Sequence, residues 1–348
     1  MGSIGPSLSD QRDAETAVMM SEMLRETRSE VDAALERACR FPPGCPERLA
    51  NAMRYALLAP GKRLRPILVL WAAEACGGDR AEAMPAAVAV EMIHAYSLVH
   101  DDLPSMDDDD LRRGRATTHV QYDESTAILA GDALQAEAFA HLVSNVPDQR
   151  LAAQLVSELA AAAGAAGLVG GQVDDLAAEA IAPTSFDASE KAIGWLASIH
   201  QRKTGALFTA CLRMGGRTAG AAPEVLDALT GYAANFGLAF QITDDLLDVT
   251  ASDEQLGKRT QKDAARGKWT YPGLMAAAAG PTETAADARR GSVYESGELS
   301  DTPLSVGVER ARQRAEELIE AAKAALALLG PPAVRLDRLA DHILERTN

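Results

Sequence analysis

The chain has few aromatic residues and no long apolar segment. Only 4% of its 348 residues are Phe, Trp or Tyr, so a hydrophobic core must be built mainly from aliphatic side chains. No uninterrupted apolar run is long enough to cross a bilayer, and we therefore predict no membrane span. The N-terminal residues are polar and lack the apolar stretch of a secretory signal, so we expect none.

Basic residues are also in short supply. The 34 Lys and Arg residues stand against 50 Asp and Glu residues, which gives a formal net charge of −16. Such a charge argues against nucleic acid or an anionic membrane surface as the partner. An anionic small molecule could still bind where local Lys and Arg groups, together with metal ions, offset the acidic charge.

Common catalytic and cofactor motifs are missing. The four cysteines, Cys39, Cys45, Cys76 and Cys211, have no metal-type spacing and indicate reduced thiols in a cytoplasmic protein. The sequence contains no recognisable Ser/His/Asp or Cys/His arrangement, no Walker-type phosphate loop and no dinucleotide fingerprint. The sequence therefore gives no indication of a nucleotide cofactor.

What the chain has in abundance is Ala and Leu at helical spacing. Both residues are strong helix formers, and no useful strand-like alternation is visible, so we predict an all-α protein. The predicted helices cover 15–39, 47–58, 63–76, 85–102, 124–144, 149–164, 167–179, 187–214, 223–250, 263–279, 308–329 and 333–346.

The helical segments are predicted to form one domain over 15–348, because no linker divides them. Residues 1–14 are expected to be disordered. The stretch 279–307 is rich in Gly, Pro, Ser, Thr and acidic residues, and we interpret it as a long loop, mobile or disordered, within the domain.

Two aspartate clusters far apart in the sequence carry the strongest functional signal. In the second cluster, Asp244 and Asp248 lie one helical turn apart on one face and can share a cation. Carboxylates about 4 Å apart repel by roughly 4 kcal/mol at an effective dielectric of about 20, so a folded chain keeps them beside a cation or in water. Carboxylate oxygens suit Mg²⁺, which also binds substrate phosphates. Two facing clusters therefore indicate a phosphate substrate bridged by Mg²⁺.

The first cluster begins with Asp101 and Asp102 and continues with Asp107. On an unbroken helix, Asp101 and Asp107 would point in different directions. Pro104 disfavours helical geometry at the residue before it, so we expect the helix to end or bend there and the turn to carry Asp107 back toward Asp101. For 108–110, a solvated acidic segment remains an alternative.

Short basic segments accompany both clusters. They are GKRLRP (61–66), RR (112–113), KTG (203–205), LGK (256–258) and GKWT (267–270). Arg can bind phosphate oxygens in a bidentate manner, and Lys supplies a point charge. Each segment alone is typical of surface ion pairs, but their combination with the aspartates indicates a phosphate-binding site. His94 and His100 precede the first cluster, where a histidine is more often a core or capping group.

These motifs together resemble the trans-isoprenyl diphosphate synthase family, also called polyprenyl synthetases. The resemblance implies an isoprenoid-synthase fold, with about a dozen helices around a central cavity, and a homodimeric, Mg²⁺-dependent prenyltransferase. The matching segments span about 60–275 in the family's order and are GKRLRP (61–66), EMIHAYSLVHDDLPSMDDDDLRRG (91–114), ILAGDAL (128–134), GGQVDD (170–175), KTGALF (203–208), FQITDDLLDV (240–249), LGK (256–258) and GKWTYPGLM (267–275).

The resemblance also assigns roles to residues. Three Mg²⁺ ions per site are expected on Asp101, Asp102, Asp107, Asp244 and Asp248, with catalysis also involving Asp245 and Lys203. The isopentenyl diphosphate site would consist of Lys62, Arg65, His94 and Arg113. The allylic diphosphate would be bound by Arg112, Lys203, Thr204, Gln241, Lys258 and Lys268.

The expected reaction is head-to-tail condensation of isopentenyl diphosphate with dimethylallyl and then geranyl diphosphate, giving farnesyl diphosphate. The nearest alternative is a geranylgeranyl diphosphate synthase. A terpene cyclase or squalene-type synthase would not need Lys62, Arg65 and His94, and a non-catalytic regulatory subunit could lose the aspartates that this chain retains.

Product length is expected to depend on Tyr96 and Ser97, five and four residues before Asp101. In the family, an aromatic residue at the position of Tyr96 typically closes the floor of the product cavity, although it could be only a core residue here. The chain departs from the family at Ala116, where proline is usual, at Pro60, where glycine is common, and at Trp269, where Thr or Ser is usual. Trp269 could alter how the cavity closes.

Overall fold

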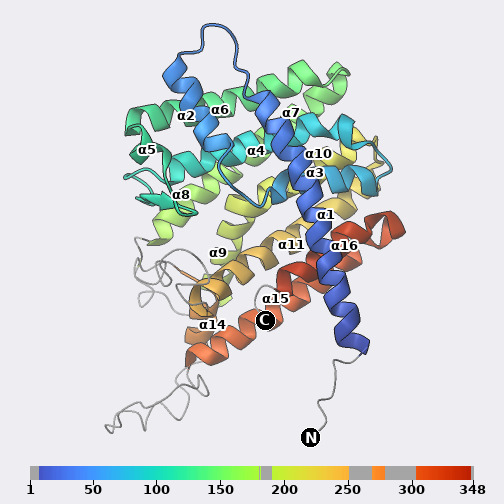
Figure 1. The fold of residues 1–348 in the computed structure, drawn as a ribbon. Helices are drawn as coiled ribbons and strands as arrows, with labels where there is room; N and C mark the ends of the chain where they lie inside the picture. Colours follow the sequence, from blue (N-terminus) through green and yellow to red (C-terminus); the bar gives the residue numbers. More distant parts are fainter. Residues whose placement is uncertain (1–7, 180, 182–189, 251–268, 279–302, 346–348) are drawn as a thin grey trace, which may run out of the picture.

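The computed structural model describes residues 8–179, 181, 190–250, 269–278 and 303–345. Within these ranges the chain is almost entirely helical, which confirms the predicted all-α fold (Figure 1). The α-helices are α1 (Leu8–Ala38), α2 (Glu47–Leu57), α3 (Leu64–Ala75), α4 (Arg80–Asp101), α5 (Thr118–Gln121), α6 (Glu124–Asn145), α7 (Gln149–Ala163), α8 (Leu168–Glu179), α9 (Glu190–His200), α10 (Ala206–Thr218), α11 (Pro223–Thr250), α14 (Tyr271–Ala278), α15 (Pro303–Ala325) and α16 (Val334–Leu344).

The remaining elements are short. A π-helical turn, η2 (Gln201–Gly205), joins α9 to α10, and two 3₁₀ turns, η4 (Leu326–Leu328) and η5 (Pro331–Ala333), separate α15 from α16. Strands β1 (Leu111–Arg112) and β2 (Arg115–Ala116) form an antiparallel hairpin. The hairpin was not predicted, because strands of this length cannot show an alternating pattern.

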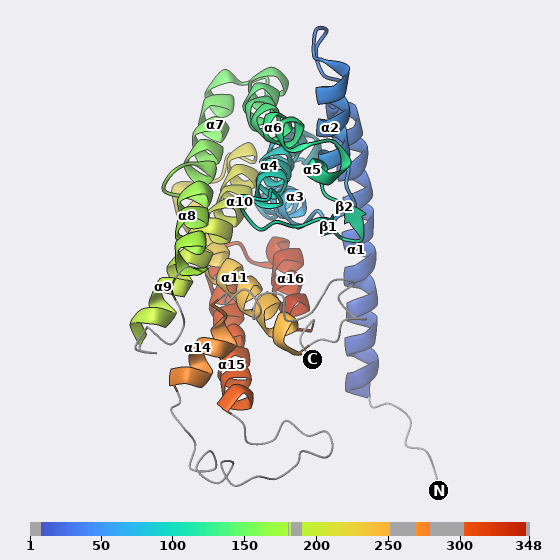
Figure 2. The same cartoon turned by 90° about the vertical axis from the view of Figure 1, so that its left-hand side faces the viewer.

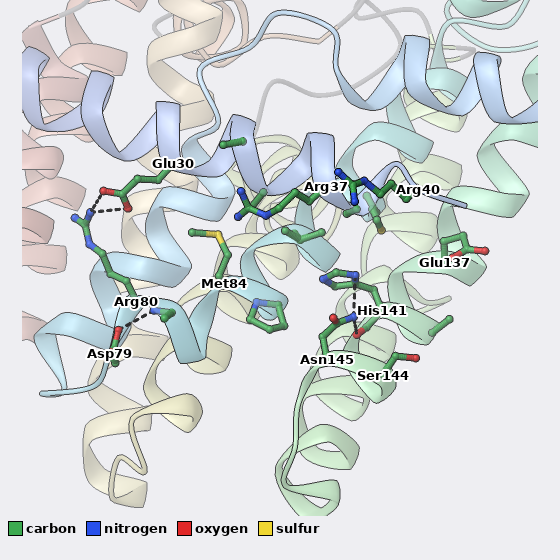
Figure 3. A pocket seen from close by; sticks show the side chains of 18 residues that line it. Glu30, Arg37, Arg40, Asp79, Arg80, Met84, Glu137, His141, Ser144 and Asn145 are labelled. Atoms are coloured by element: carbon green, nitrogen blue, oxygen red, sulfur yellow. Dashed lines mark hydrogen bonds and ion pairs between the residues drawn. The ribbon is translucent and has the colours of Figure 1, made fainter. Parts of the chain in front are cut away.

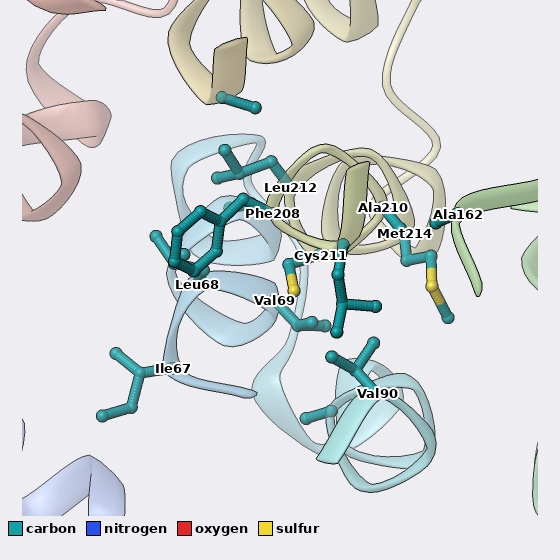
Figure 4. Close-up of a cluster of buried hydrophobic side chains, with 14 of the residues drawn as sticks. Ile67, Leu68, Val69, Val90, Ala162, Phe208, Ala210, Cys211, Leu212 and Met214 are labelled. Atoms are coloured by element: carbon teal, nitrogen blue, oxygen red, sulfur yellow. The ribbon is translucent and has the colours of Figure 1, made fainter. Parts of the chain in front are cut away.

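The core lies where α3, α4 and α10 pack together near the centre of the molecule (Figure 4). Leu68 and Val69 on α3 meet Phe208 and Leu212 on α10, and all four side chains are fully buried. A β-carbon on Gly215 would collide with the carbonyl of Val69, so glycine allows the two helices to approach closely. These central helices form the frame on which the predicted site residues are mounted.

The outer helices surround this core. In Figure 2, α1 runs along one side of the molecule, while α7, α8 and α9 form the opposite edge and α14 and α15 lie at one end. The stretch Gln149–Glu179, which includes α7 and α8, could cross a membrane by length and composition alone. One such stretch among the described residues is weak evidence, because core helices of soluble proteins pass the same test.

Several predicted boundaries differ from the structure. Helix α1 begins at Leu8 instead of residue 15, because the sequence contains no proline or glycine between Pro6 and the end of the helix at Ala38. Helix α4 begins at Arg80 instead of Pro85, since the side chain of Asp79 accepts a hydrogen bond from the amide of Ala81 at 2.8 Å and caps an earlier turn.

The later boundaries differ as well. The single helix predicted over 187–214 is divided by η2, and the helix predicted over 263–279 is described only as α14. Helix α15 begins at Pro303, within the loop predicted over 279–307, where proline suits the first turn. The rest of that loop, 279–302, lies outside the described residues, as do 1–7 of the segment predicted to be disordered.

Candidate active site

Helix α4 ends at Asp101, and the chain then turns back on itself. The amide of Asp107 donates to the carbonyl of Asp101 at 2.8 Å, and the amide of Asp109 donates to the carbonyl of Asp102 at 3.1 Å. The turn contains Pro104, as the sequence predicted, and it brings Asp107 back to the end of the helix. The acidic residues of the first cluster therefore gather at one point.

The carboxyl groups of this cluster have different surroundings. Burial raises the pKa of Asp101 to about 6, while Lys203 opposes the rise and the nearby Asp107 adds to it. Asp102 is buried and accepts a hydrogen bond from Nε of Arg112 at 2.7 Å. Burial alone would lower the pKa of Arg112, but this hydrogen bond and the charge of Asp102 raise it above its usual value. Asp102 is thus paired with an arginine of the chain itself, although burial outweighs Arg112 and raises the pKa of Asp102.

The β-hairpin positions the two arginines that follow the cluster. Its two-residue turn consists of Arg113 and Gly114, with φ values of 53° and 74°, as in the I′ turns that match the twist of a hairpin. The hydroxyl of Tyr55 donates to the carbonyl of Ala116 at 2.7 Å and anchors the hairpin to α2. The guanidinium of Arg113 then reaches back and donates to the carbonyl of Pro60 at 2.5 Å.

The predicted isopentenyl diphosphate residues come from three elements that meet here. Arg113 packs against Gly61, the residue before Lys62. On α3, Arg65 places Nη1 3.4 Å from Nε2 of His94 on α4, and its guanidinium lies 5.0 Å from the ring centroid of Phe208. Burial, followed by the charges of Arg65 and Arg113, lowers the pKa of His94 well below its usual value. His94 is therefore neutral and can accept a hydrogen bond from Arg65.

The π turn η2 carries Lys203 and Thr204. Nζ of Lys203 lies 2.6 Å from Oδ2 of Asp175 on α8, and the hydroxyl of Thr204 donates to Oε1 of Gln241 on α11 at 2.6 Å. Such π turns are rare inside helices and occur often at functional sites. Because Lys203 also lowers the pKa of Asp101, this one turn connects the first aspartate cluster to the helix that bears the second.

The second cluster lies on α11, one turn beyond Gln241. Burial lowers the pKa of Arg65, and the negative charge of Asp244 partly offsets this effect. Asp244 is therefore within electrostatic range of Arg65, one of the predicted isopentenyl diphosphate residues. Asp245 accepts a hydrogen bond from the amide of Tyr271 at 2.9 Å and lies 3.6 Å from Nε2 of His200. Asp248 follows Asp244 by one turn of the same helix.

Two predicted lysines cannot be placed, since Lys258 and Lys268 lie outside the described residues. Trp269, which follows Lys268, is buried. Its indole donates to the carbonyl of Ile181 at 3.1 Å and packs edge-on against Trp195 at 5.5 Å. The unusual residue at this position thus fixes the start of α14 against the neighbouring α9.

The donor set suits Mg²⁺. Asp101 and Asp107 offer carboxylate oxygens whose mutual repulsion, added to burial, raises the pKa of Asp101, and a divalent cation would offset that charge. In the part of the chain that the structure describes, no group of three or more His, Cys, Asp or Glu side chains could hold a metal ion by itself. Mg²⁺ in proteins is usually bound through one or two carboxylates plus water and substrate phosphates.

The sequence analysis missed several residues that support this site. Asp175 belongs to the GGQVDD motif, but nothing in the sequence indicated its contact with Lys203. Arg63, in the middle of the basic segment at 61–66, is buried and binds Glu91 at 2.7 Å and Asp32 at 2.8 Å. Arg63 precedes the first residue of α3 and has a left-handed backbone conformation, with φ of 52°. Its side chain therefore stabilises the loop before α3, whereas Lys62 and Arg65 are the residues predicted to bind substrate.

A separate groove of about 1040 Å³ lies between α1, α4 and α6 (Figure 3). Met84 and Met92 of α4 line it, and Arg37 of α1 and Arg40, two residues beyond the end of α1, extend over its rim. None of the predicted site residues lines this groove, so its position gives no support to any of their roles.

The fold and the site together define an all-α protein in which carboxylates and cationic side chains from α3, α4, α8, η2 and α11 gather in one region. The polyprenyl synthetase family model matches residues 46–295, and the chain belongs to this family of prenyltransferases.

Similar proteins include both product classes. The chain is 43% identical over 337 residues to a dimethylallyltranstransferase of Fischerella ambigua, covering 96% of this chain and 86% of that protein. It is 46% identical over 233 residues to a farnesyl diphosphate synthase of Bacillus subtilis, covering 66% and 76%. A geranylgeranyl pyrophosphate synthetase from the archaeon Geoglobus acetivorans superimposes with a TM-score of 0.77 at 32% identity, covering 94% and 99%.

Proposed function

We propose that this protein condenses isopentenyl diphosphate with allylic diphosphates and releases inorganic diphosphate. The observation that carries the proposal is the arrangement around η2. Lys203 interacts with Asp101 of the first cluster, and Thr204 bonds to Gln241, one turn before Asp244 of the second. A diphosphate at this turn would lie between both clusters, with cationic groups of the chain beside it.

The reaction follows from charge neutralisation. When bound, Mg²⁺ would neutralise the allylic diphosphate as it departs. Lys203, Thr204 and Arg112 would orient its oxygens, so that the bond between carbon and the diphosphate oxygen breaks and leaves an allylic cation. Arg65, His94, Arg113 and Lys62 would hold isopentenyl diphosphate with its double bond toward that cation. After carbon–carbon bond formation, a proton leaves to the departing diphosphate.

Farnesyl diphosphate is the proposed product, from dimethylallyl and then geranyl diphosphate. Tyr96 supports this choice, because its side chain is buried on α4 about 7.5 Å along the axis from Asp101, at 1.5 Å per residue. A large ring at that depth would stop a growing chain early. Geranylgeranyl diphosphate is the alternative, since relatives with either product are similar to this chain. A homodimer is proposed on the family resemblance alone, and a cytoplasmic location on the spacing of the four cysteines.

The decisive experiment is an assay of the purified protein with dimethylallyl diphosphate, isopentenyl diphosphate and Mg²⁺, followed by chromatography of the dephosphorylated products. We expect farnesol as the main product and no turnover in EDTA. Asp101→Asn and Asp244→Asn should each lower kcat by about a hundredfold or more, because each loses a carboxylate for the neutralising cations. Asp110→Asn is the matched control, because Asp110 belongs to the same acidic segment but is exposed.

The outcomes separate the alternatives. Full activity in EDTA or in Asp101→Asn would refute the metal-dependent mechanism. A wild-type protein that makes mainly the twenty-carbon product would replace farnesyl by geranylgeranyl diphosphate. Conversion of an allylic diphosphate to a cyclic hydrocarbon, with no use of isopentenyl diphosphate, would refute the proposed reaction.

A further inference from the structure

Gln172 on α8 is a buried amide with no hydrogen bonds. Its side chain is only 7% exposed, and neither Nε2 nor Oε1 has a hydrogen-bond partner. A primary amide carries two donor hydrogens and an acceptor oxygen, and most buried side-chain polar atoms in proteins are satisfied. An unsatisfied group of this kind requires an explanation, and a bound ligand is one.

The position of Gln172 points to the predicted substrate. Gly171, the preceding residue, packs so tightly on η2 that a β-carbon there would collide with the backbone of Lys203. Asp175, one turn further along α8, holds Nζ of Lys203 at 2.6 Å. The buried face of α8 therefore lies against η2, whereas Val169 and Val173 on its other side are exposed.

The turn η2 also lies beside the residues proposed to bind the allylic diphosphate. Lys203 is the strongest cationic influence on the carboxyl of Asp101, and Thr204 is bonded to Gln241. Gln172 is consequently placed on the wall of the site where the allylic diphosphate is proposed to ionise. Charged side chains there are already proposed to bind the diphosphate, and an uncharged amide would add little to its neutralisation. The allyl group is therefore the more suitable partner for Gln172.

We propose that Gln172 contacts the allylic substrate and that its amide oxygen stabilises the allylic cation. This inference rests on the proposed function. An amide oxygen has a strong dipole but is weakly basic, so it can lower the energy of a neighbouring cation without removing its proton. A carboxylate at the same place would act as a base or capture the cation. A fixed dipole in a water-excluded site acts most strongly where charge develops in the transition state.

The bond changes are those of the proposed reaction. The bond between C1 and oxygen breaks, both electrons leave with the diphosphate, and the positive charge is shared by C1 and C3 of the allyl group. The isopentenyl double bond then supplies the electron pair of the new carbon–carbon bond, and a proton is lost to diphosphate. Gln172 forms no covalent bond at any step.

The test compares Gln172→Leu with the wild-type enzyme in binding and catalysis. Leucine has a similar size but no polar atoms. The probes are an allylic thiolodiphosphate, which cannot readily ionise, and an ammonium analogue of the allylic cation added together with inorganic diphosphate, both with Mg²⁺. Gln172→Leu should weaken binding of the ammonium analogue by about tenfold to a hundredfold, as expected for a lost transition-state interaction, and thiolodiphosphate binding by less than about threefold.

Catalysis and stability give independent readouts. We expect kcat to fall by about tenfold to a hundredfold while KM for the allylic substrate stays within about threefold. The thermal midpoint should rise, because the substitution removes unsatisfied buried polar groups. Gln172→Met provides a second variant if leucine disturbs folding, because methionine is unbranched like glutamine and apolar like leucine. Val173→Ala, on the exposed side of α8, should change neither binding nor kcat.

Two results would overturn the role of Gln172. Equal weakening of both analogues would show a ground-state contact, and an unchanged kcat with a lowered thermal midpoint would show a purely structural residue. A wild-type protein that binds neither analogue and forms no product would instead refute the proposed function itself, so the two failures are distinguishable.

Discussion

Arg113 occupies the space that a side chain on Gly61 would need. Its Nη1 would collide with the β-carbon of any other residue at position 61, and it donates to the carbonyl of Pro60 at 2.5 Å. The backbone before Lys62 thus serves as the support that positions the guanidinium of Arg113. Two predicted isopentenyl diphosphate residues, distant in sequence, depend on one glycine.

Gly61→Ala should therefore impair isopentenyl diphosphate binding without unfolding the protein. The group that must move is the end of a flexible side chain, so the cost falls on the position of Arg113. We expect KM for isopentenyl diphosphate to rise by about tenfold, because a charge-assisted contact is worth about 1.5–3 kcal/mol, and KM for the allylic substrate to change little. Steady-state kinetics with each substrate varied in turn measures this.

Gly194→Ala is the matched control. A β-carbon at this position of α9 meets no atom within 4 Å, so the substitution should leave both KM values unchanged and slightly favour the helix. If Gly61→Ala raised both KM values equally, Arg113 would not be specific to the isopentenyl subsite.

Asp175→Asn should impair the allylic subsite. Asp175 is buried and holds Lys203 at 2.6 Å, and removing its charge frees the ammonium group to adopt other positions. We expect kcat/KM for the allylic substrate to fall by about tenfold, which corresponds to about 1.4 kcal/mol. Steady-state kinetics with dimethylallyl or geranyl diphosphate varied separately, at saturating isopentenyl diphosphate, gives this value for each allylic substrate.

The adjacent Asp174 provides the control. It pairs with Arg202, and both side chains are about one-third exposed, so solvent screening makes the pair worth little. Asp174→Asn should retain nearly full activity. Similar losses in the two variants would indicate a general disturbance of α8 and not the loss of support for Lys203.

The sequence predicted the helices well because Ala and Leu periodicity dominates nearly every segment. It did not predict η2, since a π turn differs from an α-helix by one extra residue per turn and leaves no distinct pattern in Gln201–Gly205. It also missed the early start of α4, where the capping bond of Asp79 outweighs the tendency of Pro85 to occupy a first turn.

Only the local features of the candidate site could be predicted, because contacts between distant residues leave no pattern in the sequence. Pro104 correctly indicated the end of α4, and with it the return of Asp107. The contacts between Lys203 and Asp175 and between Arg63 and Glu91 join residues 28 positions apart. Tertiary packing alone decides such pairs, so local spacing could not separate Arg63, which supports the fold, from Arg65.

The buried pair of Arg63 and Glu91 should contribute strongly to stability. Both side chains are almost inaccessible and their oxygen and nitrogen lie 2.7 Å apart. Glu91→Gln would leave the buried guanidinium with the more exposed Asp32 as its remaining carboxylate partner among the described residues, beside the carbonyl of Ala59. We expect the free energy of unfolding to fall by about 3 kcal/mol or more. Urea unfolding followed by circular dichroism measures the change.

An exposed ion pair supplies the comparison. Arg314 and Glu317 lie 2.9 Å apart on α15, with side chains about half exposed. Glu317→Gln should change the free energy of unfolding by less than about 0.5 kcal/mol. If Glu91→Gln also lowered the free energy of unfolding by less than about 0.5 kcal/mol, the buried pair would not hold α3 against α4.

Tyr96→Ala should lengthen the product. The Tyr96 ring is buried, packs edge-on against His100 at 5.8 Å, and makes no hydrogen bond of normal geometry through its hydroxyl, although Gln135 of α6 is near enough to oppose the rise in its pKa that burial causes. The phenol is therefore held mainly by packing. Its removal would open space one and a half turns below Asp101, in the direction in which a fifteen-carbon chain would grow.

The expected result is a shift from farnesyl toward geranylgeranyl and longer products. The rate of the first condensation should stay within about threefold of wild type, because the diphosphate-binding groups are unchanged. Ser97→Ala should shift the distribution less, since the small Ser97 hydroxyl already bonds to the carbonyl of His94 in its own helix at 2.9 Å. Product analysis with radiolabelled isopentenyl diphosphate measures both variants. If Tyr96→Ala folds normally and still stops at the wild-type length, Tyr96 is a core residue and the floor of the cavity is formed elsewhere.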